Sequence, residues 1–474
     1  MFDRVVVPQR LALIYRSGQT LGYNPGVNVW ERLEPDTAEV LRWLRAGRPK
    51  ADAGAHLQRR FGYTPERAQE RLEEIARWGL FRRMFYLDRE PDVPLPVVPS
   101  RPLKMVYWIC TQACNLRCTY CYQDATVARP HELTTAEAKD LVDQVVEAGA
   151  QTFIITGGEP FSRRDLMEIV QYAKGRGLRV NVITNGHYIT EKNAKEVAKA
   201  FNTITISLDH GLAKHHDCNR GEGSWERAVR AVDLLLAEGA KVDLNSVLSH
   251  EGLQDIKELI RFGRKRKIGT HKIMPQYPMG RGAENRYGEL TVPELLGLND
   301  RLNQVNIDLE SEGEGELRAP NEAKGTSKGT RRAHCGAGLA EVSVDPEGWV
   351  YPCKLLQYTE LRSDNIRDRR LAEIVTHPVI AGTAKRVVDT LHPCKTCIVK
   401  NHCGGGCRGI HYSFTGAYTE TEPLFCAHLR RSFEVYAWST TGEVPPERTT
   451  GFKFDPASPA VPNFIPLSRL EESL

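Results

Sequence analysis

The sequence lacks any apolar run that approaches the length of about 20 residues needed to cross a bilayer. It also lacks a secretory leader pattern, since Pro8, Gln9 and Arg10 interrupt the apolar residues near the N-terminus. Neither sign of charge dominates, because 64 basic and 60 acidic side chains leave a formal charge of only +4. These absences argue against membranes and nucleic acids as partners, and we expect a cytoplasmic protein.

The composition is otherwise that of an ordinary globular protein with a sizeable core. The chain has 474 residues, of which 41% are hydrophobic and 26% charged. This length suffices for two to four domains. The chain also has 12 cysteines, many of them closely spaced. In a reducing compartment, clustered cysteines are more often metal ligands than disulfide partners, so they indicate where the chemistry lies.

Residues 1–88 are predicted to form a winged-helix-like α+β domain, with a hairpin turn at 17–18 and amphipathic helices at 37–44 and 65–78. The order of helices and glycine turns resembles the pyrroloquinoline-quinone chaperone-like domain, a peptide recognition element. That resemblance implies that the domain pairs an edge strand with the leader of a precursor peptide. A helical packing domain and a DNA-binding winged helix are the alternatives. The proline-rich residues 89–103 are expected to be a linker.

Strand-like and helix-like segments alternate through residues 104–309. The expected strands are 105–110, 152–156, 179–184, 203–208, 241–247 and 272–275. The expected helices are 134–148, 164–174, 191–201, 224–238 and 253–266. Such alternation predicts parallel strands joined by right-handed crossovers. We therefore predict an α/β protein with a partial (β/α)6 barrel of the TIM type, flanked by the N-terminal domain and a C-terminal cysteine-rich iron–sulfur domain.

Three cysteines, Cys114, Cys118 and Cys121, follow the first expected strand. Three thiolates on one loop hold three corners of a cubane iron–sulfur cluster and leave the fourth iron free for a ligand. A zinc knuckle or a set of buried thiols is the alternative. The spacing, with the aromatic Tyr120 before the last cysteine, resembles the radical S-adenosylmethionine (radical SAM) superfamily. This resemblance implies a 4Fe–4S cluster that binds SAM, and reductive cleavage of SAM to a 5'-deoxyadenosyl radical.

A glycine pair with a carboxylate follows the second expected strand, at Gly157, Gly158 and Glu159. Glycines allow a backbone to approach a ligand closely, and a carboxylate suits an ammonium group. In the family that the chain resembles, this motif grips the amino group of SAM. A tight strand-to-helix turn without a ligand is the alternative.

Three more SAM contacts are implied by the resemblance. Ser207 and Arg220 stand where the cysteine-rich branch of the family binds the ribose and the carboxylate of SAM, and an arginine fork suits a carboxylate. Asn245 is expected to touch the ribose or adenine. Other chemically active side chains are expected to be structural: Cys110, His215, His216 and Cys218.

Seven cysteines between residues 335 and 426 form a second group, whose spacing resembles the SPASM domain with its two auxiliary iron–sulfur clusters. The resemblance assigns the outer cluster to Cys394, Cys397, Cys403 and Cys426. It assigns the inner cluster to Cys335, Cys353 and Cys407. With three cysteines the inner cluster has an open iron, a non-cysteine ligand or a 2Fe–2S core. Zinc is the alternative, although structural zinc sites take four ligands each.

Lys354 follows Cys353 directly, where sulfatase-maturating relatives carry an aspartate that serves as a base. This departure argues against sulfatase maturation, and no catalytic acid or base is assigned. Residues 310–334 are expected to be a flexible connector, 335–436 the SPASM domain and 437–474 an extended tail.

The function predicted from these motifs is that of a radical SAM peptide maturase. It would abstract a hydrogen from a ribosomally made precursor peptide and install an oxidative crosslink, either a thioether or a C–C or C–O bond. A reductase such as flavodoxin or ferredoxin would supply electrons. The alternatives are a radical SAM enzyme of a cofactor pathway, tetrapyrrole or peptide-derived, and a zinc-binding winged-helix regulator.

Overall fold

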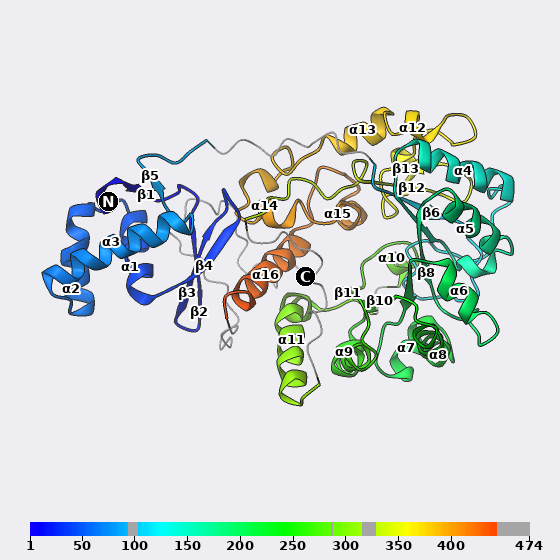
Figure 1. Cartoon of the computed structure of the whole chain (residues 1–474), viewed down its shortest axis with the longest axis horizontal. Helices are drawn as coiled ribbons and strands as arrows, with labels where there is room; N and C mark the ends of the chain where they lie inside the picture. Colours follow the sequence, from blue (N-terminus) through cyan, green and yellow to red (C-terminus); the bar gives the residue numbers. More distant parts are fainter. Residues whose placement is uncertain (93–102, 286–287, 315–328, 443–474) are drawn as a thin grey trace.

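The computed structural model describes residues 1–92, 103–285, 288–314 and 329–442. Most of the predicted linker, the centre of the predicted connector and most of the predicted tail lie outside the described residues. Figure 1 shows an N-terminal α+β unit at one end of the molecule and a large sheet with its helices at the other. The cysteine-rich segment, yellow to orange, runs between them. No helix in the described part of the chain is both long and apolar enough to span a membrane.

The large sheet contains the six predicted strands, all parallel, in the order of the chain. They are β6 (Met105–Ile109), β7 (Thr152–Thr156), β8 (Arg179–Thr184), β9 (Thr203–Ser207), β10 (Val242–Leu248) and β11 (His271–Pro275). The helices between them are α4 (Thr135–Glu147), α5 (Leu166–Gly175), α6 (Ala194–Ala200), α7 (Ala213–Arg220), α8 (Ser224–Ala237) and α9 (Ile256–Lys265). The predicted α/β fold class is confirmed.

Alternating burial explains how the sheet is built. In β6, Val106 and Trp108 are fully buried against the helices, whereas Tyr107 between them is half-buried on the opposite face. The same alternation runs through β8 and β10. Successive residues of a strand point to opposite faces, so one face forms the helix-covered core and the other lines the barrel interior. Helix α4 begins at a capping box between Thr134 and Glu137, which satisfies its first N–H groups.

The sheet is wider than predicted, because two strands of the cysteine-rich segment join it. Strand β12 (Glu341–Val344) pairs in parallel with β6, and β13 (Val350–Tyr351) pairs antiparallel with β12. Cys335 and Cys353 lie on either side of this hairpin. The hairpin between these two cysteines is thereby part of the barrel sheet.

Three barrel-side helices were not predicted: α7, α10 (Arg281–Glu284) and α11 (Val292–Ser311). Helix α7 carries two histidines, an aspartate and an asparagine and has no apolar stripe, so its sequence gives no periodic signal. Helix α11 does begin at a capping box, at Thr291 and Glu294. The short α10 follows β11. The cysteine-rich segment adds α12 (Leu371–Ile374), α13 (Pro378–Ala384), α14 (Lys400–Cys403), α15 (Arg408–Thr415) and α16 (Pro423–Ser439).

The N-terminal unit is a three-stranded antiparallel sheet packed on three helices. Its strands are β2 (Ala12–Arg16), β3 (Gln19–Asn24) and β4 (Val29–Leu33). Its helices are α1 (Pro35–Arg45), α2 (Ala53–Phe61) and α3 (Pro65–Phe81). A further pair, β1 (Val5–Val6) with β5 (Tyr86–Leu87), ties the two ends of the unit together. Helix α3 ends three residues later than the predicted helix.

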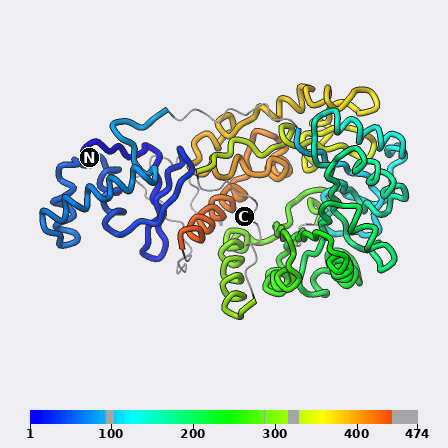
Figure 2. Tube along the Cα trace, viewed as in Figure 1, coloured from blue at the N-terminus to red at the C-terminus, as the bar shows by residue number. Residues whose placement is uncertain are grey.

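The second face of the N-terminal sheet packs on helix α16 of the cysteine-rich segment. Tyr23 and Trp30 are fully buried there with Phe433 and Trp438. The ring centroids of Tyr23 and Phe433 are 4.6 Å apart. Figures 1 and 2 both show this helix lying beside the sheet. The N-terminal unit is therefore docked on the cysteine-rich segment through an apolar interface.

A buried network of charges completes this interface. Arg16 of β2 and Arg431 of α16 both bind Asp300 of α11, at 2.5 Å and 2.9 Å. Arg431 also binds Glu434 at 2.8 Å. Only 5% of the Arg16 side chain is exposed, so its charge depends on these carboxylates for compensation.

We expect Asp300→Asn to lower the free energy of unfolding by about 2–3 kcal/mol, because two buried guanidinium groups lose their shared counter-charge. Urea unfolding would measure this change. The matched control is Asp233→Asn, which breaks the exposed Asp233–Arg266 ion pair and should cost less than about 1 kcal/mol. Equal effects of the two substitutions would contradict this account of the interface.

Candidate functional site

The three-cysteine loop leaves β6 at the carboxyl end of the parallel strands, the edge where such folds place their chemistry. Cys110 is fully buried where the strand ends, in agreement with the structural role predicted for it. The loop closes on itself, since Cys114 N–H donates to the Thr126 carbonyl at 3.2 Å and Thr126 N–H donates to the Gln112 carbonyl at 2.9 Å. The side chains of Cys114, Cys118 and Cys121 are partly exposed.

The glycine pair after β7 supports this loop directly. Gly158 N–H donates to the Thr111 carbonyl at 2.8 Å, and Glu159 N–H donates to the Ala113 carbonyl at 2.8 Å. A Cβ atom on Gly158 would lie 2.2 Å from the Ala113 oxygen, and one on Gly157 would lie 2.6 Å from the Thr111 oxygen. We expected these glycines to make room for a ligand. The structure shows that they make room for the backbone of the cysteine loop.

Glu159 is fully buried and joins three loops. Its carboxylate accepts hydrogen bonds from the Thr184 hydroxyl at 2.6 Å and from Asn185 N–H at 2.8 Å, both at the end of β8. Burial raises the pKa of Glu159 to about 7, although these hydrogen bonds act in the opposite direction. A cation placed beside this carboxylate would favour its ionised form.

Arg281 is a second support for the loop, and the sequence analysis did not find it. From α10 its Nε donates to the Cys118 carbonyl at 3.0 Å, and its backbone N–H donates to the Cys121 carbonyl at 3.0 Å. The guanidinium also pairs with Asp124 at 2.6 Å. Arg281 lies far from the cysteines in sequence and belongs to no recognised spacing, so only the fold brings it to the loop.

Arg220 reaches the loop as a member of a buried ion pair with Asp209. Arg220 Nε donates to Asp209 Oδ2 at 2.6 Å, and its guanidinium lies 5.5 Å from the centroid of the Tyr120 ring. Its Nη1 approaches the Cys118 sulfur at 4.0 Å. Burial alone would raise the pKa of Asp209, but Arg220 outweighs it and holds that pKa well below its usual range. Asp209 was given no role in the sequence analysis.

Ser207 and Asn245, the remaining predicted SAM contacts, are direct neighbours. They face each other in the β9–β10 register, and both are half-buried on the face that lines the barrel interior. His216 is buried and accepts a hydrogen bond from Asp209 N–H at 3.1 Å, so it is structural. Cys218 is exposed on α7.

The surroundings of the loop shift the pKa of its thiols. Burial raises the pKa of Cys118 to about 11; Arg220 lowers it, and Cys121 raises it again. Across the described residues, no three His, Cys, Asp or Glu side chains converge tightly enough for one metal ion.

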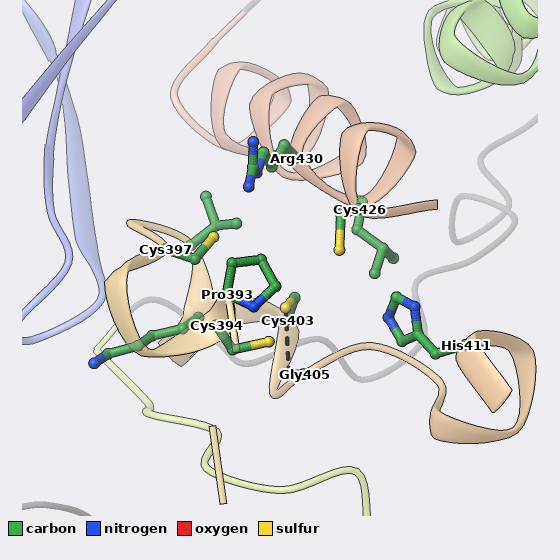
Figure 3. A pocket seen from close by; sticks show the side chains of 11 residues that line it. Pro393, Cys394, Cys397, Cys403, Gly405, His411, Cys426 and Arg430 are labelled. Carbon is green, nitrogen blue, oxygen red and sulfur yellow. Dashed lines mark hydrogen bonds between the residues drawn. The ribbon is translucent and has the colours of Figure 1, made fainter. Parts of the chain in front are cut away.

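Four cysteines of the second group line one pocket. Figure 3 shows the sulfurs of Cys394, Cys397, Cys403 and Cys426 around a shared space, with Arg430 above it. Burial raises the pKa of Cys394 to about 11 and that of Cys426 to about 12, while Arg430 lowers both. Gly405 N–H donates to the Cys403 sulfur at 3.3 Å.

The other three cysteines, Cys335, Cys353 and Cys407, are close enough to interact, since the charge of Cys407 raises the pKa of both Cys335 and Cys353. His334 cannot complete this set without losing other bonds, because Gly336 N–H occupies its Nδ1 at 2.7 Å and the Thr383 carbonyl lies 3.1 Å from its Nε2. Lys354 Nζ lies 4.8 Å from the centroid of the Tyr107 ring, in the barrel interior.

The open barrel and the loop at its rim define the class of protein. It is an α/β protein that presents three cysteines on one loop at the carboxyl edge of its parallel strands, beside a buried carboxylate and a buried arginine.

Comparison with known proteins identifies the family of the chain. The model of the radical SAM superfamily matches residues 108–263. The AdoMet-dependent heme synthase of Oleidesulfovibrio alaskensis is 30% identical over 353 residues, covering 70% of this chain and 89% of that protein. The mycofactocin maturase of Mycobacterium tuberculosis is 30% identical over 318 residues, covering 65% and 79%. SuiB of Streptococcus suis, solved with S-adenosylmethionine, has a TM-score of 0.54 at 15% identity and covers 88% of this chain and 99% of its own.

The chain therefore belongs to the radical SAM superfamily and is an enzyme. Members of this family use SAM together with a 4Fe–4S cluster, and the three-cysteine loop has the donor set for that cluster. Membership argues against the alternative of a zinc-binding regulator.

We expect Gly158→Ala to displace the loop, because its Cβ would overlap the Ala113 carbonyl. The variant should lose about four irons after anaerobic reconstitution and at least 100-fold in deoxyadenosine formation, as measured by iron analysis and chromatography. Gly175→Ala, at the end of α5, is the control, since its Cβ would meet nothing within 4 Å. Full iron content and activity in Gly158→Ala would refute this role of the glycine.

Proposed function

We propose that this chain is a radical SAM peptide maturase. It would abstract a hydrogen atom from a ribosomally made precursor peptide and install an oxidative crosslink, a thioether or a C–C or C–O bond. The observation that carries the proposal is the N-terminal α+β unit, docked on the cysteine-rich segment through Tyr23 and Trp30. SuiB matches this chain over nearly its whole length, and SuiB has been solved with its precursor peptide SuiA.

Residues 1–88 would bind the peptide leader. Their three-stranded sheet has the order β2-β3-β4, so β2 and β4 carry no further strand among the described residues. A strand edge without a pairing partner can accept an extended peptide by strand addition. The face of this sheet that carries Tyr23 and Trp30 packs on helix α16. A leader bound at an edge of the sheet would therefore be held at a fixed distance from the barrel.

The barrel rim would bind SAM, which supplies a 5'-deoxyadenosyl radical when the 4Fe–4S cluster on Cys114, Cys118 and Cys121 reduces it. Glu159 would face the ammonium group and offset the cost of its own buried charge. Arg220 would face the carboxylate with the nitrogen that Asp209 leaves free. Ser207 and Asn245, as neighbours on β9 and β10, would contact the ribose and adenine.

The cysteine-rich segment would hold two auxiliary iron–sulfur clusters, assigned as in the sequence analysis. Burial raises the pKa of Cys394 and Cys426, and the charge of Arg430 lowers it, so Arg430 would favour the thiolates that a cluster needs. Such clusters would accept the electron that crosslink formation releases, and a cytoplasmic flavodoxin or ferredoxin would exchange electrons with the chain. The fourth ligand of the inner cluster stays open.

A second candidate is the modification of a tetrapyrrole. It is favoured by the similarity to AdoMet-dependent heme synthases, one of which matches 70% of this chain at 30% identity. Two lysines in the barrel, Lys354 and Lys272 of β11, also suit a substrate with carboxylates. Burial lowers the pKa of Lys354, and the charge of Lys272 lowers it further. Nothing in this candidate uses the N-terminal sheet.

The two candidates predict different products. We expect the reconstituted enzyme, given SAM, dithionite and synthetic peptides encoded by neighbouring short reading frames, to yield a peptide lighter by two hydrogens. One deoxyadenosine should form for each crosslink, as measured by mass spectrometry. In the parallel reaction, an iron porphyrin with carboxylate side chains should remain unchanged. Loss of carbon dioxide from the porphyrin, with every peptide intact, would favour the second candidate and contradict the first.

A further inference from the structure

Helix α15 connects the two groups of auxiliary cysteines. The helix starts directly after Cys407, a predicted ligand of the inner cluster. One turn later, His411 N–H donates to the Cys407 carbonyl at 3.1 Å, and the His411 side chain lines the pocket of the outer cluster. A single turn of helix therefore separates an inner ligand from the wall of the outer site.

The tautomer of His411 follows from its hydrogen bond. The backbone N–H of Glu422 donates to His411 Nδ1 at 2.9 Å. A ring nitrogen that accepts from an N–H group carries no proton, so the imidazole is neutral and its proton is on Nε2. The Phe425 ring packs edge-on against the imidazole at 5.0 Å and holds its orientation.

This Nε2–H group has no acceptor among the described residues. His411 is 1% exposed, and its Nε2 is buried without a hydrogen-bond partner. An unpaired buried donor costs about 1–3 kcal/mol, so proteins rarely leave one without a purpose. The other side chains that line the pocket are apolar, or cationic donors, apart from four cysteines: Cys394, Cys397, Cys403 and Cys426. Figure 3 shows the imidazole beside the space that these sulfurs surround.

We propose that His411 Nε2–H donates a hydrogen bond to a sulfur of the outer cluster and thereby raises the reduction potential of that cluster. The role rests on the proposed function, because it requires the outer cluster. A hydrogen bond to sulfur stabilises the reduced state, which carries one more negative charge. Reduction adds one electron, breaks no bond and leaves the proton on Nε2. Arg430 acts in the same direction through its charge.

The position of His411 favours electron transfer in one direction, from the inner cluster to the outer cluster. The hydrogen bond lowers the energy of an electron on the outer cluster. His411 lies one helical turn from Cys407, a predicted ligand of the inner cluster. An electron received by the inner cluster would then move outward, and a one-electron acceptor protein of the flavodoxin or ferredoxin class would remove it. His411 is thus a positioning residue for electron transfer.

The test is a redox titration followed by electron paramagnetic resonance. It uses the full chain with Cys114, Cys118 and Cys121 changed to Ala, so that only the auxiliary clusters contribute. We expect His411→Leu to disfavour reduction of the outer cluster about tenfold, a decrease of about 59 mV for one electron, with unchanged iron content. His411→Gln, whose amide N–H can reach the same place, should stay near the parent value.

His428→Leu is the matched control, because His428 is also buried in this segment but its Nδ1 lies 2.8 Å from the Leu295 carbonyl. An unmoved potential in His411→Leu, an equal shift in the control, or equal shifts in the Leu and Gln variants would overturn the donor role. Loss of about four irons in His411→Leu would overturn it in favour of a role in assembly. Absence of auxiliary iron from the parent chain would overturn the proposed function itself.

Discussion

The backbone contact between the glycine pair and the cysteine loop is the constraint on which the site depends. Gly158 and Glu159 donate to carbonyls of the loop, and neither glycine leaves space for a Cβ atom. The loop is thereby fixed to the ends of β6 and β7, and Arg281 holds its other side from α10. Because Glu159 is bonded in turn to the end of β8, hydrogen bonds connect the cysteine loop, the carboxylate and the ends of three strands.

A second constraint fixes the cysteine-rich segment relative to the SAM site of the barrel. The hairpin β12–β13 carries Cys353 at its end and extends the barrel sheet beyond β6. A cluster on this hairpin would stand on the same sheet as the SAM site, with the barrel interior between them. Helix α16 then links the outer pocket to the N-terminal sheet, through Phe433 and the charge network around Asp300. Peptide binding, radical formation and electron removal would all be anchored to one continuous framework.

The sequence was sufficient for the barrel strands, because each is a short apolar run between turn residues, and for the cysteine groups, because their spacing is distinctive. It was not sufficient for contacts that only the fold creates. Arg281 and Asp209 meet the loop from distant parts of the chain and follow no spacing rule. Helix α7 lacks an apolar stripe, and β12 looks like part of a separate domain until its pairing with β6 is seen. The glycines were recognised, but the neighbour that they accommodate was not.

The central claim is that three iron–sulfur clusters serve one radical reaction, and iron counting tests it most directly. The chain should bind about twelve irons after anaerobic reconstitution, or about ten with a 2Fe–2S inner cluster, and form deoxyadenosine when reduced with SAM. With Cys114, Cys118 and Cys121 changed to Ala, it should lose about four of these irons and form no deoxyadenosine. About four irons in the native chain, or bound zinc in the second cysteine group, would contradict the account.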